Sequence, residues 1–298
     1  MRQRRRNVPD IGIARNQNES VAITESLNLI QADNLINSND VVVITPNWVQ
    51  QQIPETGVVV GTESLRTVIR FAKRNNPRRI VVATGSGEKD TVEIMNVIGF
   101  SRIIQSEGVE FVDLNKEPFT RIELNHDSPS STNINRLYDE MTFLISFTQL
   151  KYHQEAAISA GIKNIAMGWP PAQEHGYPKK NKGIHKNLHG FIRAMAQKIT
   201  IDLSILSASP AMVGTGPSGG IPINTGIVIS GTDPVAVDTI GAHLMGFKPQ
   251  AVYYLYDCIN NGIGVGDIDK MNISGLDIIE AEKILSSMVY KQAISIDS

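Results

Sequence analysis

The densest group of side chains capable of acid–base chemistry lies between residues 151 and 190. The group consists of His153, His175, His185 and His189 together with Lys151, Lys163, Lys179, Lys180, Lys182 and Lys186. Neutral imidazoles beside lysines suit proton transfer near neutral pH, and clustered lysines attract anions. The stretch predicts a site for a small anionic molecule or cofactor, with Lys151 and His153 as catalytic residues and Lys163 as a ligand contact. The alternative is a solvated loop.

Three candidate residues follow apolar runs that we expect to be strands. Lys151 and His153 come after the run 141–147, and Asn47 comes after the run 41–44. Ligands of open α/β sheets gather at the carboxyl ends of strands. We therefore expect Asn47 to orient the ligand, and we expect Trp48 to serve as packing rather than as a stacking platform.

A carboxylate, Asp238, lies in a predicted helix that starts at Pro234 and is otherwise apolar at this point. A buried carboxylate needs a partner, so Asp238 either pairs with backbone or a lysine, or acts as a base. It is our third catalytic candidate. Asp233 fits a helix N-cap before Pro234 and is a candidate ligand contact, as is Asn164 beside Lys163.

A glycine-rich turn at residues 84–87 follows one strand and precedes a helix that begins near Thr91. Free backbone amides at such a turn hold anions, so Gly85 and Ser86 are candidate ligand contacts. A plain strand-to-helix turn is the equal alternative. The turn lacks the dinucleotide fingerprint, because Asp90 stands where the third glycine belongs.

A second glycine-rich segment, residues 214–220, matches G-x-G-x-x-G letter for letter. A strand rather than a helix is expected after it, so we do not expect NAD bound in the Rossmann manner. The segment, with Gly216 at its centre, either brings its backbone close to a ligand or simply connects two strands. The chain has no Walker A sequence.

The histidines raise the question of a metal. His185 and His189 are four residues apart and would share one face of a helix, and His175 precedes them. These three are the candidate ligands of a divalent metal, although a solvated helix face is the commoner meaning of such spacing. The single cysteine, Cys258, excludes a cluster held by four cysteines, so we expect no iron–sulfur cluster and an inert, buried thiol.

Composition excludes several classes of protein. The chain has 298 residues, a formal charge of −2 and a hydrophobic fraction of 41%. It lacks the positive field that holds nucleic acid, and its apolar runs are too short for a membrane span, so we expect a cytoplasmic protein with neither partner. The sequence does not indicate the oligomeric state.

The order of elements predicts an α/β fold: a mainly parallel sheet flanked by helices, with an inserted lobe around residues 165–190. Expected strands cover 11–14, 41–44, 79–83, 110–112, 143–147, 201–206 and 226–230, and expected helices cover 20–34, 62–74, 91–98, 187–198, 234–245 and 249–260. Residues 168–186 are expected to form a long loop. We expect residues 1–10 to be a disordered basic tail, residues 11–280 a single domain in one or two lobes, and residues 281–298 a C-terminal helix and tail.

Several motifs together resemble one protein family. They are Thr45-Pro46-Asn47-Trp48, Lys151-x-His153, Lys163-Asn164, the His185 region, residues 214–220 and 262–267, Met245-Gly246-Phe247 and, above all, G-T-D-P-V-A-V-D at 231–238. They resemble the family called domain of unknown function 362, DUF362, from about Ile11 to Gly275. The resemblance implies an α/β protein, often with ferredoxin-type cysteines that this chain lacks. The family usually has Lys where Thr45 stands and Thr where Tyr152 stands, which implies an altered activity.

Three hypotheses follow. The first is a metabolic enzyme whose lysines and histidines bind a small anion. The second is a ligand-binding or regulatory module that keeps the fold without catalysis, which the residue at position 45 would allow. The third is a redox protein that holds a metal through its histidines. Binding without turnover would separate the second from the first, and stoichiometric metal would favour the third.

Overall fold

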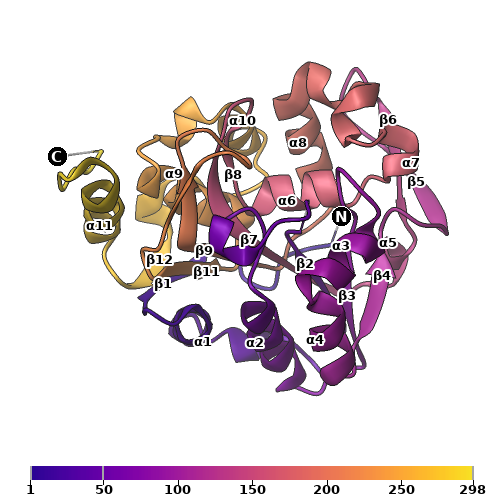
Figure 1. The fold of residues 1–298 in the computed structure, drawn as a ribbon, viewed down its shortest axis with the longest axis horizontal. Coiled ribbons are helices and arrows are strands. Elements are labelled where there is room, and N and C mark those ends of the chain that lie inside the picture. Colours follow the sequence, from indigo (N-terminus) through magenta and orange to yellow (C-terminus); the bar gives the residue numbers. More distant parts are fainter. Residues whose placement is uncertain (1, 49, 297–298) are drawn as a thin grey trace.

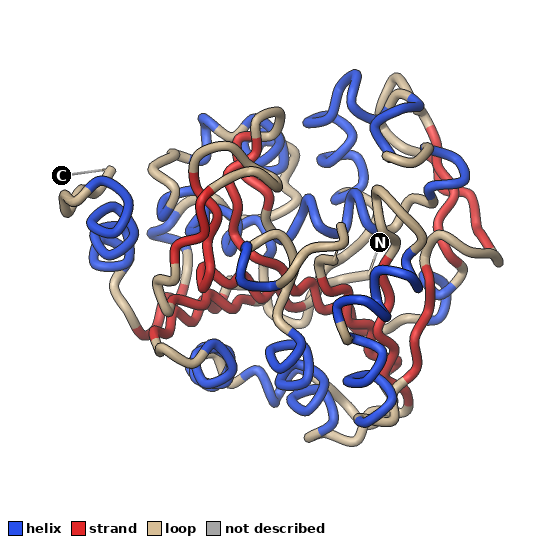
Figure 2. Tube along the Cα trace, viewed as in Figure 1, coloured by secondary structure: helices blue, strands red, loops and turns tan. Residues whose placement is uncertain are grey.

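The computed structural model describes residues 2–48 and 50–296, and within them ten strands form one mixed sheet (Figures 1 and 2). Its main path runs β12-β1-β11-β9-β7-β2-β3-β4, and β8 and β10 extend β7 and β9. The bounds are β1 (Asp10–Arg15), β2 (Val41–Pro46), β3 (Arg79–Thr84), β4 (Glu110–Asp113), β7 (Phe143–His153), β8 (Ala157–Ser159), β9 (Leu203–Val213), β10 (Ile221–Ile223), β11 (Ile227–Gly231) and β12 (Asn272–Gly275).

The sheet is mainly parallel, as predicted. Strands β9, β7, β2, β3 and β4 run parallel, β1 pairs in parallel with β12, and β11 runs opposite to its neighbours β1 and β9. Strands β2 and β9 are buried along almost their whole length. Their runs of apolar and β-branched residues are typical of parallel strands that are covered on both faces.

Helices cover both faces of the sheet and enclose two hydrophobic cores (Figure 2). One face carries α1 (Glu19–Leu29), α2 (Thr62–Lys73), α3 (Thr91–Ile98) and α4 (Phe100–Ser106). The other carries α6 (Gly161–Gly168), α8 (Leu188–Ala196), α9 (Pro234–Leu244) and α10 (Tyr253–Asn260), with α11 (Ile278–Tyr290) packed on α9. The α/β fold is thus confirmed. No helix in the described ranges is long and apolar enough to cross a membrane.

The predicted elements differ from the observed ones mainly in short segments. Helix α1 ends at Leu29, not near Asn34, and the predicted helix 249–260 divides into a 3-10 turn and α10. Helices α4 and α6 and the strands β5 (Phe119–Glu123), β6 (Ser131–Asn135), β8, β10 and β12 were not predicted. The cap predicted at Asp233 is confirmed, and Asp90 caps α3 in the same way, since each carboxylate accepts hydrogen bonds from two amides of the first helical turn.

The stretch 168–186, predicted to be a loop, holds three short helices. They are α7 (Ala172–His175) and the 3-10 helices η3 (Lys179–Lys182) and η4 (Ile184–Asn187), where η4 leads directly into α8. Beside them lies a separate two-stranded ribbon of β5 (Phe119–Glu123) and β6 (Ser131–Asn135), followed by α5 (Leu137–Glu140). The remaining 3-10 helices are Ala32–Leu35, Pro54–Thr56, Pro249–Ala251 and Ile268–Lys270.

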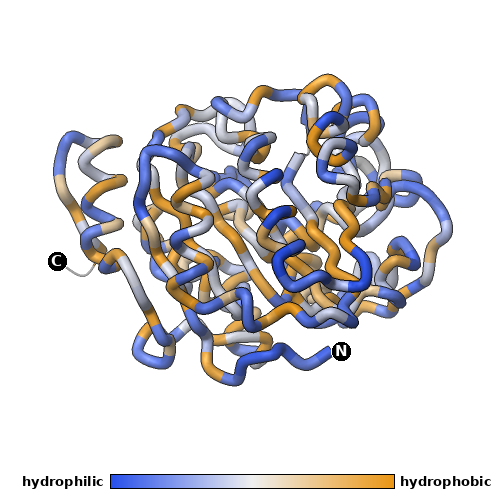
Figure 3. The backbone as a smooth tube through the Cα atoms, turned by 90° about the horizontal axis from the view of Figure 1, so that it is seen from below, coloured by the Kyte–Doolittle hydropathy of each residue, from blue (hydrophilic) through white to orange (hydrophobic). Residues whose placement is uncertain are grey.

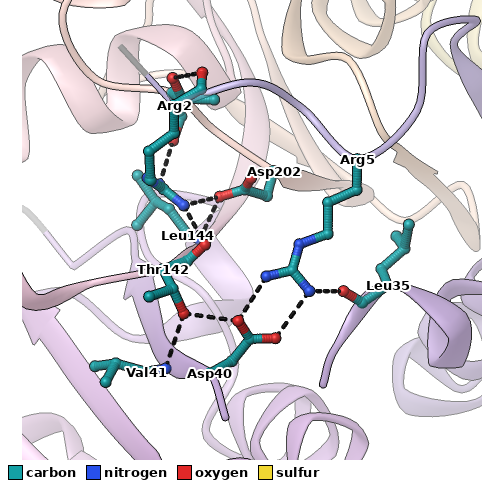
Figure 4. A network of polar contacts seen from close by, with 9 residues as sticks. Arg2, Arg5, Leu35, Asp40, Val41, Thr142, Leu144 and Asp202 are labelled. Atoms are coloured by element: carbon teal, nitrogen blue, oxygen red, sulfur yellow. Dashed lines mark hydrogen bonds and ion pairs between the residues drawn. The ribbon is translucent and has the colours of Figure 1, made fainter. Parts of the chain in front are cut away.

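The basic N-terminal segment, expected to be a disordered tail, is instead held at the amino edge of the sheet (Figures 3 and 4). Arg5 donates two hydrogen bonds to the Asp40 carboxylate at 2.8 and 2.6 Å, and Arg2 donates to Asp202 at 2.8 Å. Arg4 pairs with Asp233 at 2.6 Å. The physical reason is charge, because carboxylates buried where strands begin or end need a counter-ion, and the segment supplies guanidinium groups.

Candidate functional site: a lysine-lined cavity at the carboxyl edge

A cavity of about 240 Å³ opens where β2, β3 and β7 end. The cavity is also lined by α6, by η3 and by the loop after β9, so segments far apart in the sequence meet there. Its polar lining includes Asn47, Lys151, His153, Lys163, Asn164 and Lys179. Five of these six residues were predicted to be site residues, and three of them, Asn47, Lys151 and His153, were expected at the carboxyl ends of strands.

Three of the lining residues are buried lysines. Lys151, Lys163 and Lys179 are 2%, 9% and 3% exposed. The Lys151 ammonium donates to Asn47 Oδ1 at 3.0 Å and to the carbonyl of Val58 at 3.2 Å. In the part of the chain that the structure describes, none of the three lysines forms an ion pair with a carboxylate. Such burial of positive charge without a partner is uncommon in proteins.

The lysines differ in their hydrogen bonds. Lys179 Nζ donates to the carbonyls of Gly85 and Met167, both at 3.0 Å, which anchors η3 to the ends of β3 and α6. Lys163 Nζ, in contrast, has no hydrogen-bond partner among the described residues. Its ammonium or amine group is therefore free to contact whatever occupies the cavity.

Burial changes the charge state of these lysines. Removal from water lowers the pKa of Lys151 to about 7, helped by the nearby charge of Lys163. Burial also lowers the pKa of Lys179 to about 7, against a smaller opposing effect of Asp113, and that of Lys163 to about 8, against Glu155. All three groups therefore exchange protons near neutral pH, where buried lysines serve as acids, bases or nucleophiles.

His153 is a neutral hydrogen-bond donor in this setting. Its Nδ1 accepts hydrogen bonds from the backbone amides of Glu155 at 3.1 Å and Ala156 at 3.2 Å, so the ring proton lies on Nε2. Burial, together with the charge of Lys163, lowers the pKa of His153 to about 2. The imidazole can therefore donate a hydrogen bond from Nε2 but is a poor base, which narrows the acid–base role expected from the sequence.

Two asparagines connect Lys151 to β2 and α6 through hydrogen bonds. Asn47 Oδ1 receives the Lys151 hydrogen bond, while Asn47 Nδ2 donates to Asn164 Oδ1 at 3.4 Å. Asn164 Nδ2 donates in turn to the carbonyl of Thr45 at 2.9 Å and to Ser146 Oγ at 3.1 Å. The side chains thereby link the ends of β2 and β7 to α6. Trp48, as predicted, packs, with its ring 4.5 Å from that of Phe100, although it also lines the cavity.

Asp238 does not line the cavity. Its two carboxylate oxygens accept hydrogen bonds from the amides of Gly161 at 2.8 Å and Ile162 at 3.1 Å, and Tyr254 donates to it at 3.3 Å. Asp238 therefore caps the N-terminus of α6, the helix that carries Lys163. Burial raises the pKa of Asp238 to about 7. The structure places it as a positioning residue behind the site rather than as a base within it.

The other predicted ligand contacts have structural roles. Asp233 caps α9 and pairs with Arg4 at the opposite edge of the sheet. A Cβ atom on Gly216 would lie 1.8 Å from the Tyr152 carbonyl oxygen, so Gly216 permits its loop to pack against β7, and only the next residue reaches the cavity. Neither residue contacts the space where a ligand would bind.

The turn 84–87 reaches the cavity without offering an open anion site. Gly85 lines the cavity, and any Cβ there would lie 2.6 Å from the Gly168 carbonyl oxygen. Ser86 is buried in the turn, where its amide donates to Thr91 Oγ1 at 3.1 Å. The first amides of α3 already donate to the Asp90 carboxylate. The turn therefore contributes shape rather than amide donors from the helix start.

The three histidines proposed as metal ligands are not brought together. His175 Nε2 is bonded to Thr132 Oγ1 at 2.7 Å, and His185 Nδ1 contacts the Glu155 carboxylate. His189 uses both ring nitrogens, since it accepts from the Tyr254 amide at 3.0 Å and donates to the Glu155 carbonyl at 2.9 Å. Within residues 2–48 and 50–296, no cluster of three or more His, Cys, Asp or Glu side chains could hold a metal.

An iron–sulfur cluster does not fit the residues that the chain provides. Cys258 is the one cysteine of the sequence, and it is buried. Burial raises the pKa of its thiol well above the usual range, which keeps it protonated and a poor metal ligand.

Lys179 is the one buried lysine of the described cavity lining that was not predicted to be a site residue. It begins the segment Lys179-Lys180-Asn181-Lys182, whose letters give no reason to separate one lysine from the next. Lys179 is buried whereas Lys180 is exposed. The distinction comes from the way in which η3 docks on β3, a contact between distant segments that no local pattern encodes.

Comparisons with known proteins agree with the predicted resemblance. The thylakoid-associated protein sll1697 of Synechocystis sp. is 21% identical over 221 residues, which cover 74% of this chain and 67% of the relative. The lactate racemase apoprotein from Thermoanaerobacterium thermosaccharolyticum aligns with a TM-score of 0.45 and 17% identity over 73% of this chain, and the chain spans only 53% of that protein. The family model described as domain of unknown function (DUF362) matches residues 42–243, so the chain belongs to the DUF362 family.

Proposed function

We propose that the cavity binds a small organic anion and that the protein is an enzyme acting on it. The observation that carries the proposal is the set of three buried lysines, Lys151, Lys163 and Lys179, which have no carboxylate partner in the described part of the chain. The anion would supply the missing negative charge. His153 Nε2 would add a neutral donor to its recognition.

The energetics favour a ligand that is itself charged. A charge buried without a partner costs several kcal/mol, in the range of about 3–5 when a buried pair is broken. A carboxylate or phosphate between the lysines would recover the electrostatic loss as binding energy.

The size of the cavity limits the ligand. Its volume is about 240 Å³, below the range of roughly 300–1,000 Å³ that is usual for drug-sized ligands. A metabolite of a few carbon atoms with one or two acidic groups fits this space. Propanoate and inorganic phosphate are therefore suitable probes.

Isothermal titration calorimetry tests the proposal. Propanoate and phosphate are titrated into the protein at pH 7.5, in two buffers of different ionisation enthalpy. Because a bound anion raises the pKa of the lysines, binding should take up protons, and the observed heat should differ between the buffers. Lys151→Met should weaken binding at least tenfold, and the exposed control Lys186→Met should not. Absence of binding by both probes would refute the proposal.

A second candidate is a binding module without catalysis. It is favoured by one observation, that the carboxylates lining the cavity are engaged: Glu155 contacts His185, and Glu88 accepts from Gln50 at 2.6 Å. A general base would then have to come from a lysine. Anion binding with no conversion of any bound 2-oxo or 2-hydroxy acid would support this candidate over the enzyme.

A further inference from the structure

We propose that Lys163 forms an imine with the carbonyl carbon of a small 2-oxo acid bound in the cavity, while Lys151 and Lys179 hold its carboxylate. The inference rests on the anion site proposed above and adds a substrate class and a covalent step. Its basis is a difference in surroundings among three lysines that line the same cavity.

The nitrogens of Lys151 and Lys179 are held in place by acceptors of the chain itself. Lys151 Nζ donates to Asn47 Oδ1 and to the Val58 carbonyl. Lys179 Nζ donates to the carbonyls of Gly85 and Met167 and lies 3.4 Å from that of Gly168. Each of these acceptors requires a proton on the nitrogen. The two lysines are thus fixed as donors, which suits them to hold a carboxylate and not to attack a carbonyl carbon.

The nitrogen of Lys163 is not held in this way. Lys163 is only 9% exposed, and its Nζ has no acceptor among the residues that the structure describes. The nitrogen is therefore not tied to the wall of the cavity and can approach a carbonyl carbon bound there. Burial lowers the pKa of Lys163 to about 8, which leaves a useful fraction of amine near neutral pH.

The chemistry balances without any further reactant. The lone pair of Lys163 Nζ attacks the carbonyl carbon, and the carbonyl π electrons move to oxygen, which accepts the hydrogen bond of His153 Nε2. One proton passes from the attacking nitrogen to this oxygen to give the carbinolamine. The second proton of the nitrogen follows as the C–O bond breaks, so that the oxygen leaves as water and a C=N bond forms. One amine and one carbonyl thus give one imine and one water, with no change of oxidation state.

Reductive trapping tests the inference. Wild-type protein is incubated with pyruvate or glyoxylate and sodium cyanoborohydride, which reduces an imine to a stable secondary amine. Intact mass spectrometry followed by peptide mapping locates the adduct. We expect one adduct per chain, on Lys163, with either probe. No adduct with both probes, or an adduct spread over exposed lysines or located on Lys151 or Lys179, would overturn the inference.

Variants separate this inference from anion binding. Lys163→Arg keeps the charge but lacks a nucleophilic amine, so it should lose the adduct. The exposed control Lys186→Met should keep both the adduct and propanoate binding. If wild type binds propanoate but pyruvate gives no adduct, the imine is wrong and the anion site stands. If propanoate does not bind either, the proposed function itself fails.

Discussion

At the amino edge of the sheet, Asp40 and Asp202 are 5% and 4% exposed, and each lies within 2.8 Å of a guanidinium group from the N-terminal segment. At the carboxyl edge, Lys151 and Lys179 are buried to the same degree. There the structure, over the residues it describes, brings no carboxylate within ion-pair distance. The sheet thus carries buried aspartates that form ion pairs at one edge and buried lysines that form no ion pair with the described residues at the other.

The difference separates charges that are paired within the chain from the charges that we propose to bind an anion. Burial by itself raises the pKa of Asp40, yet hydrogen bonds from Arg5, the Asn37 amide and Thr142 hold that pKa below its ordinary value. At Lys151, burial lowers the pKa and nothing restores it. A charge that stabilises the fold is paired within the chain, whereas a site for an anion leaves its positive charges unmatched.

The largest effect should follow from breaking a pair at the amino edge. Arg5→Met leaves the buried Asp40 carboxylate without its guanidinium partner. We expect a loss of about 3 kcal/mol in the free energy of unfolding at pH 7, since removing one partner of a buried pair strands the other. Urea denaturation of the variant and wild type measures it.

The control for this change is Arg136→Met, which removes an exposed pair with Asp139. Exposed pairs contribute about 0–1 kcal/mol, so this variant should unfold close to wild type. Equal losses for the two variants would show that the amino-edge pairs do not have the structural role assigned to them.

At the carboxyl edge, removal of a charge should have the opposite sign. Lys163→Met removes a buried charge whose pKa is lowered by burial to about 8, so it should stabilise the ligand-free protein by on the order of 2 kcal/mol at pH 6.5. The gain should shrink as the pH rises from 8 to about 10, because the unfolded lysine then loses its proton as well. Chemical denaturation at both ends of this range gives the answer, with Lys186→Met as the exposed control. Destabilisation by Lys163→Met would contradict the comparison.

The affinity for anions should depend on pH in a defined direction. Burial lowers the pKa of Lys151 and of Lys179 to about 7, so both lose charge as the pH rises through 7 to 8. Propanoate affinity should therefore fall by about tenfold or more between pH 6.5 and pH 9. Calorimetric titrations at these two pH values decide the matter. A constant affinity would mean that the lysines keep ordinary pKa values.

The smallest effects should come from variants that remove either the hydrogen-bond donor or the hydrogen-bond acceptor of His153. In His153→Asn an amide oxygen can still accept from the Glu155 and Ala156 amides, but the Nε2 donor is lost, so anion affinity should fall by about fivefold with stability nearly unchanged. His153→Gln keeps a donor at the end of the side chain and loses the acceptor, so stability should fall more than affinity. Thermal unfolding and calorimetry compare the two. The reverse pattern would assign the donor role to another residue.

Sequence patterns predicted the fold well because buried parallel strands appear in the sequence as runs of mostly apolar residues. The runs 41–44 and 143–147 are mostly apolar and pair in parallel, so Asn47 and Lys151, a few residues further along each chain segment, lie toward the same edge of the sheet. The cavity residues nearest to strand ends were predictable for this reason. Their placement follows from strand direction alone.

The remaining features depend on contacts between distant segments. Asp238 was expected to need a partner, yet nothing local indicates that its partners are the amides of Gly161 and Ile162. The arginines at the start of the chain were expected to form a disordered tail. The local sequence does not reveal their ion-pair partners, because these aspartates are spread along the chain from Asp10 to Asp233. His185 and His189 share helical spacing, but η4 precedes α8 and their rings contact different parts of Glu155.

The most direct test of the account is an NMR titration of the lysine side chains, following the Cε and Nζ resonances of Lys151, Lys163 and Lys179 with pH. All three lysines should titrate near pH 7 to 8 in the ligand-free protein, and the pKa values of Lys151 and Lys179 should move upward when propanoate is added. Titration of all three lysines at ordinary values, with no response to the anion, would contradict the central claim that the cavity holds unmatched positive charge for an anionic ligand.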